Sequence, residues 1–422
     1  MPVALDARDR AMLAGDEGAG TAFAMRLVLV AAEALGAERL LDITGAHVDS
    51  CLFHGQATLD FVDRLAQGGT RVAVPTTLNV GLVDLLHPER WRGGAAEAEA
   101  GRRLMDAYRA LGCRPTYTCA PYQTAWARPG LGEQVAWAES NAIVFCNSVL
   151  GARTERYGDF TDIACAVTGR APAAGLHRTD ARRATLVLRL APDVPASLRD
   201  HDVLYPVLGT VLGRRAGSAV AALVGLPTGV SEDRLKAVGA AAASSGAVAM
   251  FHAVGSTPEA PTLDAALHGA PPDADEPITL GELRAARDAL TTARGDRLGA
   301  VSLGTPHASL AELRAVAEAL EGRRTRVELL VSTGRDVLAA AAEEGVVARL
   351  EAAGVELLVD TCSYLAPILR DAPGAVMTDS GKWAAYAPAN IGREVVYASR
   401  ADCLRSAVAG RVLVDLAPWG GA

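Results

Sequence analysis

The sequence predicts an α/β protein of several domains, with parallel or mixed sheets flanked by helices. Segments with the apolar spacing of an amphipathic helix alternate with short apolar runs typical of strands, near both ends of the chain. Polar residues gather where the predicted strands end, which is where open α/β sheets bind ligands. At 422 residues, the chain is long enough for two or three domains.

The composition is that of a globular protein without a nucleic-acid or membrane partner. Hydrophobic residues make up 50% of the chain, and the net charge of −8 argues against a nucleic-acid surface. No run approaches the roughly 18 apolar residues that a membrane span needs, and the charged N-terminus lacks the features of a signal peptide. We therefore expect a cytoplasmic protein whose seven cysteines are reduced. Without a CxxC pair, a zinc ribbon is unsupported.

The N-terminal elements alternate as this fold class requires. A helix is predicted at 21–36, a short strand within ERLLDITGAHVDS, a helix at 58–67 and a strand in TRVAVPTTLN. The two strands end in polar clusters, which contain His47 and Asp49 in the first case and Thr76, Thr77 and Asn79 in the second. These clusters are candidates for ligand contacts.

Two regions are predicted to separate domains. Residues 170–202 are rich in proline and charge, and HGAPPDADEPIT (268–279) has the composition of a linker. Beyond it, strands in DRLGAVSLG, TRVELLVST and VELLVDTC alternate with helices at 309–322 and 335–351. We therefore predict three domains, at 1–195, 196–275 and 276–422.

The densest polar segment is residues 118–159. Glu139, Ser140 and Asn141 precede an apolar run, predicted to be a buried strand, which continues into Cys146-Asn147-Ser148 and then Arg153. Buried polar groups need hydrogen-bond partners, so this density indicates either loop capping or a network that binds a ligand.

Polar residues at later strand ends form a second set of candidates. His307 precedes a capping box at the start of a helix, and Cys362 follows a strand in VDTC. The chain has only two lysines. Lys236 is expected to be solvated on its helix, whereas Lys382, in a Ser380-Gly381-Lys382 loop beside aromatic residues, suits a point charge for a carboxylate or phosphate.

These segments, in this order, resemble the large-subunit portion of the aconitase X family over nearly the whole chain. The matching stretches are GAHVDS, VPTTLNVGLVDLLHPERW, TCAPY, ESNAIVFCNSVLGARTER, FHAVGSTPEA, GTPHAS, DTCSY and TDSGKWAAY. Several stretches in register make this resemblance specific.

The resemblance implies an aconitase-like multidomain core and a hydro-lyase that dehydrates a small β-hydroxy acid. The family's substrate classes are cis-3-hydroxy-L-proline, which gives Δ1-pyrroline-2-carboxylate, and 5-phosphomevalonate. The resemblance also implies an iron–sulfur cluster or a mononuclear iron, with Cys119 and Cys362 as ligands. We assign catalytic roles to Lys382, Ser380, Ser148 and His307, and substrate binding to Asn147, Arg153, Thr76, Thr77 and His47.

The sequence departs from the family pattern in its cysteines and near its C-terminus. Thr305 stands where some members have a third cysteine, whereas Cys146 stands where alanine is more usual. Cys146 therefore either packs at a strand end or replaces the missing ligand. The chain also ends soon after ADCLRSAVAG, which predicts that a separate small subunit supplies the swivelling domain.

Three functional interpretations remain open at this stage. The first is a cis-3-hydroxy-L-proline dehydratase, and the second is a dehydratase of 5-phosphomevalonate or of a hydroxy acid from a specialised pathway. The third, prompted by Thr305, is a metal-free scaffold or regulatory subunit that has lost catalysis.

Overall fold

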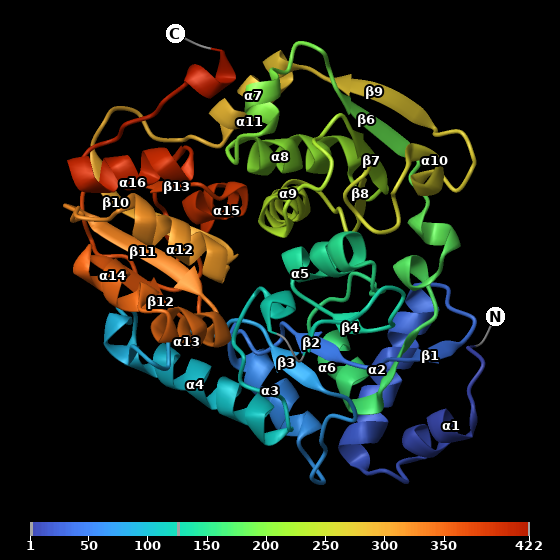
Figure 1. Cartoon of the computed structure of the whole chain (residues 1–422). Coiled ribbons are helices and arrows are strands. Elements are labelled where there is room, and N and C mark those ends of the chain that lie inside the picture. The colour runs from blue at the N-terminus through green and yellow to red at the C-terminus, as the bar shows by residue number, and fades with distance from the viewer. Residues whose placement is uncertain (1–2, 125–126, 421–422) are drawn as a thin grey trace.

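The computed structural model describes residues 3–124 and 127–420, which form three α/β bodies arranged around a common centre (Figure 1). Each body is built on a sheet of parallel strands, and the order of the bodies follows the chain. This confirms the predicted α/β class with parallel sheets flanked by helices.

The first body contains a three-stranded parallel sheet in the order β3-β2-β4 and a separate antiparallel pair, β1-β5. Val48, Leu78 and Ala136 contribute to its core, together with apolar side chains of the surrounding helices. The strands are β1 (Leu40–Asp42), β2 (Ala46–Val48), β3 (Thr76–Leu78), β4 (Ala136–Trp137) and β5 (Arg170–Pro172). The helices are α1 (Ala7–Ala14), α2 (Ala19–Ala34), α3 (Gln56–Leu65), α4 (Ala95–Ala110), α5 (Ser140–Phe145) and α6 (Thr161–Thr168), with shorter turns η1 (Pro88–Arg90), η2 (Pro121–Gln123), η4 (Cys146–Leu150), η5 (Gly175–His177) and η6 (Asp180–Arg182).

The second body has a four-stranded parallel sheet in the order β8-β7-β6-β9. Its strands are β6 (Leu186–Leu190), β7 (Ala221–Val224), β8 (Phe251–Ala253) and β9 (Ala274–Ile278). Its helices are α7 (Ala196–Arg199), α8 (Leu204–Ala216), α9 (Glu232–Ser245), α10 (Leu263–Ala266) and α11 (Leu280–Ala289).

The third body has a five-stranded parallel sheet in the order β12-β11-β10-β13-β14. Its strands are β10 (Leu298–Ala308), β11 (Glu328–Thr333), β12 (Val355–Leu358), β13 (Ala375–Thr378) and β14 (Val395–Tyr397). Its helices are α12 (Leu310–Ala319), α13 (Arg335–Glu343), α14 (Val346–Ala352), α15 (Gly381–Ile391) and α16 (Arg400–Ala409), followed by η7 (Ala417–Trp419).

Several local predictions are wrong. The segment after Glu139 is helix α5 and not a strand, because the Glu139 side chain caps it by accepting a hydrogen bond from the Ala142 N–H at 2.9 Å. The region expected to be a linker contains β9, the edge strand of the second sheet. The helix expected at 335–351 is interrupted at Gly345. The left-handed φ of 72° at this glycine ends the regular helix, and α14 begins at the next residue.

Among the helices in the described part of the chain, none combines the length and hydropathy of a membrane span. The cytoplasmic location and the domain boundaries at 195/196 and 275/276 stay predictions.

Candidate metal centre and active site

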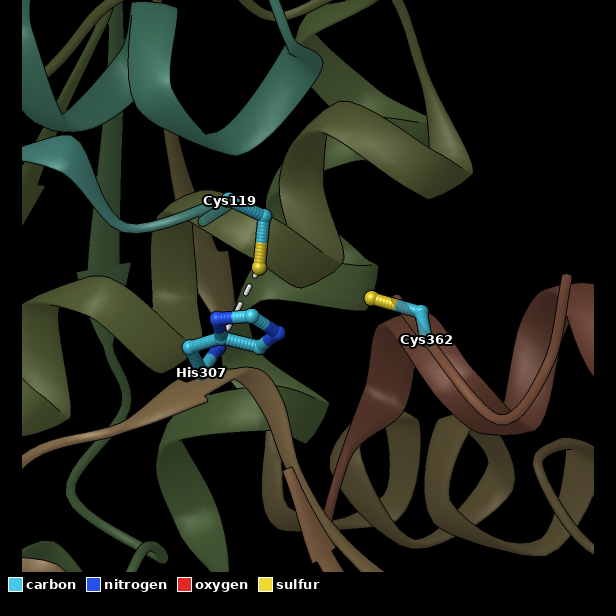
Figure 2. A group of neighbouring side chains, drawn as sticks. All are labelled: Cys119, His307 and Cys362. Atoms are coloured by element: carbon cyan, nitrogen blue, oxygen red, sulfur yellow. Dashed lines mark hydrogen bonds between the residues drawn. The ribbon is translucent and has the colours of Figure 1, made fainter. Parts of the chain in front are cut away.

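The first and third bodies meet at a buried group of two thiols and an imidazole. Cys119 precedes η2, His307 lies near the end of β10 and Cys362 follows β12. One potential ligand atom from each lies within 4.8 Å of the others, and all three residues are buried. Figure 2 shows the sulfur atoms of Cys119 and Cys362 directed toward the imidazole from two sides. The two expected ligands, Cys119 and Cys362, thus lie close together. His307, which was expected to be catalytic, lies with them.

Hydrogen bonds fix this geometry. The His307 backbone N–H donates to Cys119 Sγ at 3.2 Å, and His307 Nδ1 lies 2.9 Å from the Thr118 hydroxyl. Burial lowers the pKa of His307 to about 4, so its imidazole is neutral at neutral pH and retains a lone pair for a metal. Hydrogen bonding with Cys119 and burial both raise the pKa of the Cys362 thiol. Forming a thiolate there therefore requires a compensating positive charge.

The donor set fits a metal of the kind the sequence predicts. Thiolate and imidazole ligands suit iron, zinc and iron–sulfur clusters. Metal–ligand bonds are about 2.0–2.3 Å long, so donor atoms this close together can share one ion or cluster with little adjustment. A potential metal site formed by Cys119, His307 and Cys362 is thus present.

A buried ion pair lies beside this group. The Lys382 ammonium contacts the Glu139 carboxylate, and Lys382 Nζ is 3.5 Å from the Ser140 hydroxyl. The ammonium also lies 5.9 Å from the centre of the Tyr364 ring. Burial disfavours the charged form of Lys382, but the Glu139 carboxylate outweighs this effect and raises the lysine pKa. Lys382 is therefore a fixed cation, suited to holding an anion and unsuited to accepting a proton.

A narrow pocket extends from Lys382 toward the second body. The predicted loop at Ser380-Gly381-Lys382 is wrong, because Gly381 and Lys382 are the first residues of α15. Ser380, expected to be catalytic, caps this helix, and its hydroxyl accepts a hydrogen bond from the Trp383 N–H at 3.0 Å. The buried Thr305 hydroxyl lines the same pocket and has no hydrogen-bond partner among the described residues.

Lys236 also lines this pocket, where it is only 4% exposed. Its ammonium contacts Asp233 at 2.9 Å and also Glu312. The expectation that Lys236 is solvated is therefore wrong, because two carboxylates compensate the charge inside the protein.

Cys146 lies outside the group of potential metal ligands. It is the first residue of η4, a π-helical turn, and packs in an apolar cluster with Tyr122, Trp137 and Phe145. Burial raises the pKa of its thiol. These surroundings are those of a packed cysteine, the first of the two alternatives drawn from the sequence.

The residues that follow Cys146 make contacts within the chain. The Asn147 amide donates to the carbonyls of Thr154 and Ala249 at 2.9 and 3.1 Å, and its oxygen accepts from the Thr154 N–H at 3.1 Å. The Ser148 hydroxyl accepts from the Phe251 N–H at 2.9 Å. Through Ala249 and Phe251, these bonds join the first body to the second. The predicted roles of Asn147 and Ser148 toward substrate gain no support from these contacts and stay predictions.

The other predicted substrate-binding residues are also engaged. Arg153 donates to the Thr179 hydroxyl at 2.9 Å, and Thr76 donates to the Val74 carbonyl at 2.8 Å. Thr77 Oγ1 lies 2.8 Å from His47 Nδ1 and 3.2 Å from the Ala46 carbonyl. Burial lowers the pKa of His47 to about 3. These residues lie on or beside the first sheet, and their roles toward substrate stay predictions.

Sequence reasoning missed two residues that organise this region. Glu139 was noted only as one of many polar residues, although its positive φ of 71° and its contact with Lys382 place it centrally. Arg182 was not singled out, yet its guanidinium is fully buried and donates to Asn147 Oδ1 at 3.0 Å and to Glu259 at 3.0 Å. No local pattern marks Arg182, because its partners come from distant segments.

The fold and this centre define a multidomain α/β protein with a potential Cys₂His metal site at the junction of two bodies. Models of the first, second and third domains of aconitase X match residues 2–180, 184–288 and 298–409. The chain belongs to the aconitase X family.

Individual relatives agree with this assignment. A cis-3-hydroxy-L-proline dehydratase of Pseudomonas aeruginosa is 42% identical over 98% of this chain and 72% of its own length. The phosphomevalonate dehydratase large subunit of Methanothermobacter thermautotrophicus is 36% identical over 94% of this chain and 96% of its own. The crystal structure of Thermococcus kodakaraensis aconitase X in its holo-form superposes with a TM-score of 0.84 at 29% identity, covering 96% of this chain and 100% of the other. These matches confirm the recognised family and the fold class.

Proposed function

We propose that the protein is a hydro-lyase that converts cis-3-hydroxy-L-proline into Δ1-pyrroline-2-carboxylate and water. The proton on the carbon next to the carboxylate and the hydroxyl on the neighbouring ring carbon leave together as water. The resulting enamine tautomerises to the cyclic imine.

The observation that carries this proposal is the similarity to named dehydratases along almost the whole chain. The relatives named for cis-3-hydroxy-L-proline are 42% and 40% identical over 98% and 97% of the chain. The relatives named for phosphomevalonate are 29% to 36% identical. The buried Cys119–His307–Cys362 group supports the same chemistry.

We propose that these three residues hold iron, as a single ion or as part of an iron–sulfur cluster. When bound, such a group supplies Lewis-acid chemistry, which lowers the cost of losing a hydroxyl group from the substrate. In this assignment His307 is the third metal ligand. Thr305 stands where some family members have that ligand, and Cys146 was the candidate to replace it.

Lys382 would bind the substrate carboxylate. Its charge is already fixed by Glu139, so binding requires no proton transfer, and its burial strengthens attraction to an anion. A positive charge there also stabilises the negative charge that develops when the proton next to the carboxylate is removed.

We propose that a small subunit with the swivelling domain completes the active site. The archaeal relatives matched over 96% and 98% of their length are named large subunits, which supports a second polypeptide. We also propose that the protein is located in the cytoplasm.

The pocket argues against a phosphorylated substrate. A phosphate would add negative charge beyond the substrate carboxylate that Lys382 holds, and the two other cations lining the pocket, Lys236 and Arg400, already share three carboxylates. The ion pairs are Lys236 with Asp233 and Glu312, Lys382 with Glu139, and Arg400 with Glu312 and Asp379.

The test is an assay of the anaerobically purified complex of this chain with the small subunit. We expect Δ1-pyrroline-2-carboxylate from cis-3-hydroxy-L-proline and no turnover of 5-phosphomevalonate. Turnover of the phosphorylated substrate alone would contradict the proposal. An iron-free complex that is inactive with both would favour the non-enzymatic scaffold.

A further inference from the structure

The three strands of the first sheet end beside one another, and each end carries a polar side chain. Asp49 follows β2, Asn79 follows β3, and Glu139 lies two residues beyond β4. The Asn79 N–H donates to the Val48 carbonyl at 2.8 Å, and the Ala138 N–H donates to the His47 carbonyl at 2.9 Å. Because the strands are parallel, their carboxyl ends lie at one edge, where ligands of α/β sheets bind.

Asp49 and Asn79 form a hydrogen-bonded pair with oxygen atoms that can accept further hydrogen bonds. The Asn79 amide nitrogen donates to the Asp49 carboxylate, which fixes the orientation of the amide because a carboxylate can only accept. The Asn79 carbonyl oxygen then lies beside the carboxylate, yet it has no hydrogen-bond partner among the described residues. Asn79 is only 3% exposed, so an unmatched acceptor there is costly without a ligand.

The charge around this pair favours a cation. Burial raises the pKa of Asp49 to about 7, and the negative charges of Glu139, Asp159 and Asp162 raise it as well. In the described part of the chain, Asp49 forms no ion pair that would neutralise it. Glu139, by contrast, is neutralised by Lys382. Glu139 therefore contacts the Lys382 ammonium and also lies close enough to the Asp49 carboxylate to influence its charge.

We propose that Asp49 and Asn79 form the subsite that binds the ring ammonium group of the substrate. This inference rests on the proposed function, since cis-3-hydroxy-L-proline carries a secondary ammonium next to its carboxylate. Its two N–H donors match the Asp49 carboxylate and the Asn79 carbonyl oxygen, while Lys382 holds the carboxylate. Asp49 and Asn79 would thus select a cyclic amino acid over a hydroxy acid that lacks nitrogen.

The test compares L-proline with (S)-tetrahydrofuran-2-carboxylate, in which oxygen replaces the ring nitrogen. Calorimetric titration of both ligands into the two-subunit holoenzyme measures the preference for the amine. For the wild type we expect L-proline to bind at least about tenfold more tightly. Asp49→Asn should weaken L-proline binding by about 10- to 100-fold and leave the oxygen analogue within about twofold.

Asp159→Asn is the matched control, because it removes a nearby negative charge from an exposed position. It should keep the wild-type preference for L-proline. If Asp49→Asn folds poorly, Asn79→Thr serves instead, since threonine keeps a donor for Asp49 and removes the carbonyl acceptor. It should also reduce the preference.

The outcomes separate this inference from the proposed function. Equal weakening of both ligands by Asp49→Asn, an unchanged preference, or no preference in the wild type would overturn the amine subsite. Turnover of cis-3-hydroxy-L-proline is measured separately on the wild-type complex. Absence of turnover with an Asp49-dependent preference would overturn the proposed function and leave the amine subsite standing.

Discussion

Lys382 and Glu139 illustrate how one buried charge depends on another. Replacing the lysine alone leaves the buried carboxylate unpaired, which typically costs about 3–5 kcal/mol of stability. We therefore expect Lys382→Met to lower both the unfolding free energy and the activity, the latter by at least about 10²-fold.

The double variant Lys382→Met/Glu139→Gln separates the two effects. Removing both charges should restore most of the stability measured by denaturant unfolding, while kcat/KM stays low. Recovery of kcat/KM along with stability would show that Lys382 serves the fold alone.

Asp49 gives the site a defined dependence on pH. Its pKa near 7 means that the carboxylate is protonated at lower pH, and the neutral form cannot pair with an ammonium. The Kd of L-proline should therefore rise as the pH falls below about 7, approaching tenfold per pH unit. Calorimetry from pH 5.5 to 8.5 would measure this rise.

Asp49→Asn should remove that rise, since asparagine does not titrate. Asp159 and Asp162 also face Asp49, and the pKa of Asp162 is raised to about 6. Any pH dependence that persists in the variant therefore belongs to these neighbours. An identical profile in wild type and variant would contradict the assignment to Asp49.

Arg182 is predicted to be essential for stability. Its fully buried guanidinium pairs with Glu259 and donates to the Asn147 side chain and to the carbonyls of Leu176 and Ala152. Arg182→Met should lower the free energy of unfolding by about 3–5 kcal/mol in a denaturant titration. The exposed pair of Arg178 with Asp180 provides the control, and Arg178→Met should leave the transition unchanged. Equal effects of the two substitutions would refute this account of Arg182.

At the scale of elements, the segment 146–153 connects the first body to the second. We expect Asn147→Ala to lower the free energy of unfolding by about 1–3 kcal/mol, because four hydrogen bonds are lost from a buried site. The Kd of L-proline should stay within about twofold. The exposed Asn390 provides a control whose replacement by alanine changes neither quantity. Weaker L-proline binding at unchanged stability would instead place Asn147 in the substrate site.

The strand–helix alternation of the third body was predictable because each element there carries a clear apolar period bounded by turn residues. Helix α5 could not be predicted, because six consecutive residues of mostly apolar character fit a buried helix and a buried strand equally well. Its actual state depends on the Glu139 cap and on the second body. Strand β9 was missed because proline and acidic residues are tolerated at a sheet edge.

The candidate site could be predicted only in part from the sequence, because its residues come together through tertiary contacts. Cys119 and Cys362 could be proposed from resemblance, and the structure brings them within reach of one another. His307 and Cys119 are in contact although they lie 188 residues apart in the sequence, and local periodicity cannot predict a contact between residues so far apart. Pairings such as Lys382 with Glu139 likewise follow from how the bodies meet.

At the scale of the whole molecule, the site exists because separate bodies converge. The first supplies Cys119, Glu139 and the Asp49–Asn79 edge, and the third supplies His307, Cys362 and Lys382. The second body is tied to this junction through Ser148 and Arg182. Function should therefore fail when the docking of the bodies fails, even if each sheet stays intact.

The central claim is that Cys119, His307 and Cys362 hold the iron centre of a dehydratase. The most direct test is the iron content of the anaerobically purified two-subunit complex, compared among the wild type, Cys362→Ala and Cys146→Ala. The account predicts stoichiometric iron in the wild type and in Cys146→Ala, and at least about tenfold less in Cys362→Ala. Full iron retention by Cys362→Ala, or its loss from Cys146→Ala alone, would contradict the claim.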